Sequence, residues 1–128
     1  MTLRARLSRL VRGPQVRPVI LMYHRIAAPK VDPWGLSVSP DNFRSQLRML
    51  KSRRTPMTMD GFARACREGR LPDDAIALTF DDGYRDNLAA AKPLLEAEGV
   101  PATILVTTGL VGSKELFWWD ELTRLILL

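Results

Sequence analysis

The chain has 128 residues, 46% of them hydrophobic and 26% charged, which suffices for one globular domain but not for two. Its formal net charge of +5 comes from five arginines in residues 1–17, and residues 18–128 carry 14 basic and 14 acidic side chains. This balance excludes the basic stripe typical of nucleic-acid binders. The single cysteine, Cys66, excludes a disulfide framework and a cysteine-rich metal site.

The first 17 residues are predicted to form an arm ahead of the domain. Apolar residues recur at helical spacing in residues 2–12, with arginines between them, so this segment fits a basic amphipathic helix on an anionic membrane surface. The alternative is a disordered or loosely docked arm, because so short a helix is marginal alone. The chain contains no apolar run of the length that spans a bilayer and no secretory signal. We therefore expect a cytoplasmic or peripheral membrane protein.

The domain is predicted to span residues 18–128, and its first half contains a strand followed by two helices. Residues 19–23 are continuously apolar, which predicts a strand buried on both faces in a parallel sheet. Residues 27–38 show no periodicity and are expected to form a loop. Ser39 is placed to cap a helix that runs to about residue 53. A shorter helix is expected over residues 60–67, with Cys66 as a small buried hydrophobe.

The second half begins with a second buried strand at residues 75–80, which is followed by a helix over residues 84–98. Leu88, Ala91 and Leu95 are expected on the buried stripe of this helix, Pro93 should kink it, and Gly99 should end it.

A third strand is predicted at residues 102–106, then a loop at 107–114 and a helix from Trp118 onward. Alternation of strands and helices predicts an α/β sheet or barrel with right-handed crossovers. Residues 125–128 are all apolar, so we expect this chain to be the front part of a larger domain.

Two strand ends carry candidate chemistry. His24 follows the first strand, and Asp81 and Asp82 follow the second; functional groups of parallel α/β folds collect at such ends. Two adjacent carboxylates suit a divalent cation and proton removal from a water, and Gly83 permits a sharp turn. A plain acidic turn that ends the strand is the alternative.

Four segments point to a family. Residues 79–84 (TFDDGY), on a strand, and residues 98–103 (EGVPAT), after the helix, closely resemble the first motif region of the polysaccharide deacetylases, the NodB-homology carbohydrate esterases. Residues 22–26 (MYHRI) and 117–122 (FWWDEL) are similar to segments of the exopolysaccharide-associated branch. The resemblance covers roughly residues 18–128 and implies the N-terminal portion of a partial (β/α) barrel.

The resemblance also implies a reaction, the hydrolysis of N-acetyl or O-acetyl groups on a polysaccharide. By position, Asp81 corresponds to the catalytic base and Asp82 to the first ligand of a divalent metal, with zinc expected. His24 is a further active-site candidate, or else a hydrogen-bonded histidine of the upper core. The implied partner is an acetylated glycan.

One departure from the family bears on activity. The family completes its metal site with a His-x-x-x-His segment, and this chain has no histidine after His24, so we expect these 128 residues to be inactive. A catalytically inactive fragment or a membrane-associated binding module is therefore the alternative function. A receiver-like phosphotransfer domain is disfavoured, because the acid pair follows the second strand instead of the first. Trp34, Trp118 and Trp119 are expected in the core or a lid, with stacking on sugars as the alternative.

Overall fold

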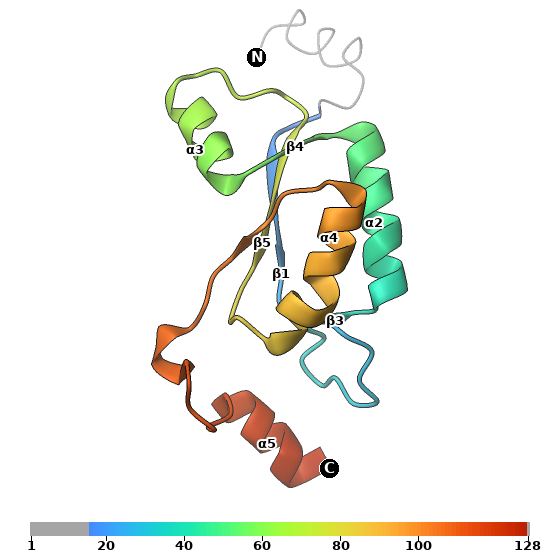
Figure 1. The fold of residues 1–128 in the computed structure, drawn as a ribbon, viewed down its shortest axis with the longest axis vertical. Coiled ribbons are helices and arrows are strands. Elements are labelled where there is room, and N and C mark those ends of the chain that lie inside the picture. Colours follow the sequence, from blue (N-terminus) through green and yellow to red (C-terminus); the bar gives the residue numbers. More distant parts are fainter. Residues whose placement is uncertain (1–15, 128) are drawn as a thin grey trace, which may run out of the picture.

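The computed structural model describes residues 16–127, which form a parallel sheet with helices on both faces (Figure 1). Strand β5 (Ala75–Phe80) is its centre and pairs with β1 (Val19–Tyr23) along one edge. On its other edge β5 pairs first with β4 (Thr55–Met57) and then with β6 (Thr103–Ile104). All these pairings are parallel, so the strands end at the same edge of the sheet. The predicted α/β class and the partial barrel are confirmed.

Strand β5 is buried over its whole length, as predicted. The prediction that β1 is buried on both faces was wrong: Leu21 and Tyr23 pack against the core, but Ile20 is 43% and Met22 59% exposed. Strand β1 pairs with β5 alone among the described residues, and no described helix covers its second face. The continuous apolar run therefore predicted the strand correctly, but it did not predict that one face of the strand is exposed.

Helices α2 (Pro40–Arg53) and α4 (Lys92–Glu98) lie side by side on one face of the sheet (Figure 1). The predicted cap is present, because the Ser39 side chain accepts a hydrogen bond from the Asn42 amide at 3.3 Å. The main core lies between these helices and the strands; its fully buried large residues include Phe43, Leu47, Leu78 and Phe80. Burial of each such side chain contributes about 1.5–3 kcal/mol.

The helix after the acid pair departs from regular geometry. Residues Asn87–Ala91 form a π-helical segment, η1, before α4 begins. Pro93 lies in the first turn of α4 and has no amide to donate to the preceding turn. The kink predicted at Pro93 stays a prediction, and the irregularity that the structure shows before it is the π segment. The wider turn also shifts the helical phase: Asn87, Ala91 and Leu95 are buried, whereas Leu88, expected on the buried stripe, is 65% exposed. Gly99 ends the helix with φ +65°, as predicted.

Helix α3 (Met59–Arg67) covers part of the opposite face, where Phe62 packs on Ala75 and Ala77. Cys66 is exposed, which corrects the expectation of a buried thiol, because the inward stripe of this short helix is centred on Phe62.

The remaining elements are two short strands, a short 3₁₀ turn and a C-terminal helix. Within the predicted loop, β3 (Ser37–Val38) pairs with β2 (Arg25–Ile26). The third predicted strand is limited to β6, and a 3₁₀ turn, η2 (Thr108–Leu110), follows it. Helix α5 (Trp118–Leu127) then lies beyond the edge where β1 and β5 end (Figure 1).

The predicted helix over residues 2–12 lies outside the described residues and stays a prediction, as does its contact with a membrane. Within residues 16–127, no helix combines the length and apolarity needed to cross a bilayer.

Candidate active site

The acid pair forms a tight turn at the end of β5. The Asp81 amide donates to the Tyr23 carbonyl at 2.9 Å, which continues the β1–β5 ladder by one residue, and the Gly83 amide donates to the Asp81 carbonyl at 2.8 Å. Asp82 has φ +68° and is the one non-glycine residue with positive φ among those described. Gly83 has φ +73°, and a Cβ there would lie 3.1 Å from Val106 Cγ1 and 3.2 Å from its Cα. The sharp turn and the need for glycine are thus confirmed.

His24 and Asp81 directly follow the neighbouring strands β1 and β5, on the same face of the sheet. Met22 pairs with Thr79 and Tyr23 with Phe80, and Tyr23 and Phe80 belong to the helix-covered core. Since side chains alternate along a strand, His24 and Asp81 fall on the face away from α2 and α4. Both residues are half-buried. No ion pair among the described residues occupies the carboxylate of Asp81 or Asp82.

These donors do not complete a metal site. Residues 16–127 contain no group of three or more His, Cys, Asp or Glu side chains arranged to hold an ion, whereas catalytic zinc takes three protein ligands. The residues present therefore do not fit a bound catalytic metal by themselves.

Tyr84 joins the acid-pair turn to α5, which sequence reasoning missed. Its hydroxyl donates to Asp120 Oδ2 at 2.9 Å and accepts from Trp119 Nε1 at 2.7 Å. Burial, together with the negative charges of Asp120 and Asp82, raises the pKa of Tyr84 to about 12, against an opposing effect of the Trp119 bond. Tyr84 is therefore a neutral donor at physiological pH. A contact across 36 residues leaves no local signal in the sequence.

Asp86 fixes the strand that follows His24. Its Oδ2 accepts from Arg25 Nε and its Oδ1 from the Ile26 amide, both at 3.0 Å. The Arg25 guanidinium also lies 4.7 Å from the ring centre of Tyr84, a cation–π distance. This network holds the His24 segment, the acid-pair turn and the start of the following helix in one arrangement.

Two exposed indoles stand beside this network. Trp118 is 69% and Trp34 47% exposed, and their ring centres are 6.3 Å apart at 69°. Trp119, by contrast, is half-buried and stacks on Phe117 at 4.6 Å. Trp118 therefore does not lie in the core, and the lid position expected as the other possibility stays a prediction.

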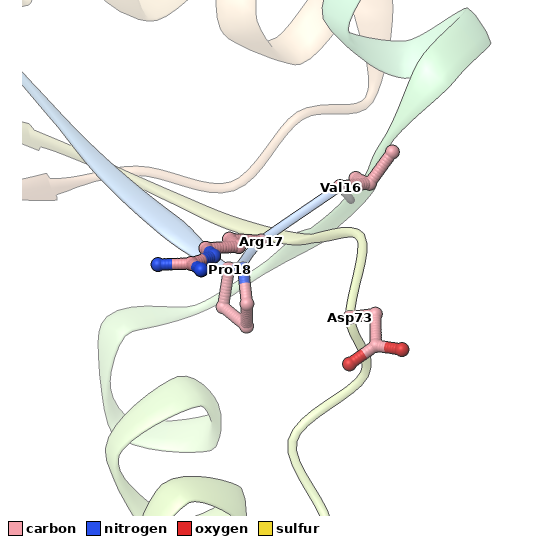
Figure 2. Close-up of a pocket in the computed structure, with 4 residues that line it drawn as sticks. All are labelled: Val16, Arg17, Pro18 and Asp73. Atoms are coloured by element: carbon pink, nitrogen blue, oxygen red, sulfur yellow. The ribbon is translucent and has the colours of Figure 1, made fainter. Parts of the chain in front are cut away.

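A cavity of about 360 Å³ is lined by Val16, Arg17, Pro18 and Asp73, at the edge where β1 and β5 begin, opposite the acid pair. In Figure 2 the Arg17 guanidinium extends away from the Asp73 carboxylate, so these groups do not converge on a common point. A second cavity, of about 190 Å³, lies between the loop of Trp34 and α5 and is lined by Pro33, Trp34, Leu122, Thr123, Ile126 and Leu127.

The fold and the site define a class. A parallel α/β sheet of partial-barrel type carries an acid pair, one of its members in a strained conformation, at the carboxyl end of its central strand. Comparison with known proteins narrows this class. The family model described as polysaccharide deacetylase matches residues 68–126. The chain is 30% identical over 89 residues to the poly-beta-1,6-N-acetyl-D-glucosamine N-deacetylase of Staphylococcus aureus (strain MSSA476), covering 69% of this chain and 31% of that protein.

Solved structures agree with the sequence comparison. The Streptococcus pyogenes deacetylase PplD, solved in complex with acetate, matches 87% of this chain and 52% of its own with a TM-score of 0.66 and 31% identity. IcaB from Ammonifex degensii matches with a TM-score of 0.65 at 24% identity, over 86% of this chain and 48% of its own, which supports the fold. Over the matched residues, the chain is similar to the N-terminal part of polysaccharide deacetylases. It spans about half of these solved chains and about a third of the curated relative.

Proposed function

We propose that the chain supplies the acid-pair portion of a metal-dependent deacetylase that hydrolyses acetyl groups on a polysaccharide. The observation that carries this proposal is the strand-end turn of Asp81, Asp82 and Gly83, in which Asp82 takes positive φ. Backbone strain of this kind persists where the surrounding structure enforces it and clusters at active sites. The family relation supports the reaction class, and the S. aureus relative suggests a polymer of N-acetylglucosamine.

In this proposal the two carboxylates have separate roles. Asp81 removes a proton from the water whose oxygen attacks the acetyl carbonyl carbon. The carbon–nitrogen bond then breaks, acetate leaves, and the amine of the sugar takes up a proton. Asp82 supplies one carboxylate ligand to a divalent metal, and His24 remains a candidate for the same site. The described residues supply fewer than the three protein ligands of a catalytic zinc.

The proposed domain boundary follows from the same relation. Residues 18–128 would be the N-terminal portion of the deacetylase domain, with residues 1–17 as an arm. The metal ligands missing here would then come from outside the described residues.

Acetate release from a partly acetylated oligomer of glucosamine tests the proposal. The assay uses the full product of the gene with zinc, cobalt or manganese supplied. Asp81→Asn should lower the rate by about 10²–10⁴-fold, the usual contribution of a general base, while Asp73→Asn, at the opposite edge of the sheet, should leave it unchanged. Wild-type activity in Asp81→Asn, or no acetate from the wild-type protein with any of the three metals, would contradict the proposal.

A further inference from the structure

We propose that Asp86 is a positioning residue of the deacetylation, which fixes the backbone after His24 so that the His24 side chain keeps one orientation beside the acid pair. The inference rests on the proposed function, because it assigns a supporting role at the same site. Asp86 acts through the two residues that follow His24 and not on the reacting atoms. Its carboxylate accepts hydrogen bonds from Arg25 Nε and from the Ile26 amide, both at 3.0 Å.

His24 is attached on both sides to the segment that carries the acid pair. Before His24, the Tyr23 carbonyl accepts a hydrogen bond from the Asp81 amide at 2.9 Å. After His24, the backbone is held by the two bonds to Asp86. The placement of His24 relative to the acid pair therefore depends on both attachments.

The second attachment is needed because the chain changes sheets at His24. Strand β1 pairs with β5, whereas β2, which follows His24, pairs with β3 in a separate two-stranded sheet. The β1–β5 ladder therefore does not hold the backbone after His24. Among the hydrogen bonds of residues 16–127, those of Asp86 join β2 to the segment after β5. Loss of these bonds should let the residues after His24 move while β1 stays in place.

The contacts of Asp86 are of a kind that fixes geometry. The Asp86 side chain is 17% and the Arg25 side chain 31% exposed, so solvent screens their ion pair incompletely. Both carboxylate oxygens accept hydrogen bonds, and bonds to an ionised group are stronger than neutral ones. The pair of Asp60 with Arg64 on α3 differs, because its side chains are 76% and 64% exposed, and such surface pairs contribute little. Asp60 is therefore a matched control.

Asp86 does not stabilise its own helix in the usual way. It stands directly before η1, and among the described contacts its side chain makes no capping hydrogen bond there. Both oxygens bond instead to residues 60 and 61 positions earlier in the chain. The π-helical geometry of η1 begins at the next residue, and π turns are frequent at functional sites. These features favour a positioning role over local stabilisation of the helix.

Proton NMR of the 128-residue chain at one fixed pH is the first test. His24 is the single histidine, so the ring C–H signals of histidine report on it alone. Asp86→Ala should shift and broaden these signals, because several orientations of the ring then interconvert, while Asp60→Ala should leave them unchanged. Asp86→Asn is a milder variant, which loses the ion pair with Arg25 but keeps an acceptor for the Ile26 amide. Urea unfolding shows that each variant is folded.

The kinetics of acetate release by the full product of the gene are the second test. Asp86→Ala should lower kcat by about 10–10²-fold, because a displacement of about 1 Å at a catalytic group has a cost of this order. KM should stay unchanged, because Asp86 does not contact the substrate, and Asp60→Ala should match the wild type in both constants. A role in stability alone would change the urea midpoint and not the rate per folded molecule.

Wild-type kcat in Asp86→Ala, or His24 signals that do not change in this variant, would overturn the inference. If Asp86→Ala does not fold, the same two criteria apply to Asp86→Asn. Acetate release that Asp81→Asn lowers and Asp86→Ala does not would refute this inference alone. Acetate release that Asp81→Asn leaves unchanged, or that the wild-type protein lacks, would refute the proposed function.

Discussion

At the scale of single residues, Asp82 is the position where stability and function are expected to conflict. Left-handed backbone costs a residue with a side chain about 1–2 kcal/mol, although aspartate tolerates it better than most. Asp82 adopts φ +68° directly before a glycine at φ +73°. A fold that needed only a turn here would gain stability from a second glycine.

Asp82→Gly should therefore raise the free energy of unfolding by about 1 kcal/mol, since glycine adopts positive φ without strain. Urea denaturation measures the change. Asp81→Gly is the matched control: Asp81 is not among the residues with positive φ, so glycine should destabilise there. A loss of stability in Asp82→Gly would contradict this expectation, because it would mean that the Asp82 carboxylate stabilises the fold by more than the strain of its backbone costs.

Tyr84 gives a prediction for alkaline pH. Its pKa is raised to about 12, so the stability contributed by the neutral phenol is complete below the unfolded-state pKa of about 10 and is lost as pH rises through about 12. Burial also raises the pKa of Tyr23, the second of the two tyrosines. Titration of phenolate absorbance should show both groups ionising late, and Tyr84→Phe should remove the signal near pH 12. Ionisation of both phenols at pH 10 would contradict the burial of Tyr84 beside Asp120.

At the scale of elements, the acid-pair turn depends on its contact with the segment after β6. A Cβ at Gly83 would lie 3.1–3.3 Å from three atoms of Val106, whereas a Cβ at Gly35, with φ +64°, meets nothing within 4 Å. The two glycines thus share positive φ but differ in surroundings.

Gly35→Ala should cost about 1 kcal/mol from backbone strain alone, and Gly83→Ala should cost about 1–3 kcal/mol more, because the turn and Val106 must move apart. Thermal or urea unfolding gives both values. Equal costs would show that Val106 yields freely and that the turn is not clamped by this segment.

The elements themselves were largely predictable from sequence. The strand at 75–80, the capped helix from Ser39 and the Gly99 terminus follow from local rules that the structure satisfies. Local rules failed to predict which side chains are exposed where this depends on other parts of the chain. The π segment moves Leu88 outward because Pro93 changes the helical phase, and β1 exposes Met22 because no described helix covers that face.

The candidate site was also predictable only in part. His24 and Asp81 could be placed at neighbouring strand ends because parallel strands end together. The bond of Tyr84 to Asp120 and the pairing of Trp34 with Trp118 could not be placed, because both join segments that are distant in sequence and depend on where α5 lies.

At the scale of the whole molecule, the sheet is open on both sides. Among the described strands, β1 and β6 each pair with β5 alone, and exposed apolar residues such as Ile20 and Ile104 lie on them. Matches to about half of each solved relative agree with this partial barrel. The acid pair is thus positioned by a core that these residues build alone, whereas the described residues contain no three donors arranged to hold a metal ion.

The most direct test is an exchange of halves. Residues 18–128 would replace the matching segment of the S. pyogenes deacetylase, which aligns with 87% of this chain, and acetate release would be measured in the folded, metal-loaded chimera. We expect an active chimera that loses activity with Asp81→Asn and both activity and metal with Asp82→Ala. A folded chimera that releases no acetate, or one that remains fully active without these carboxylates, would contradict the assignment of the acid pair.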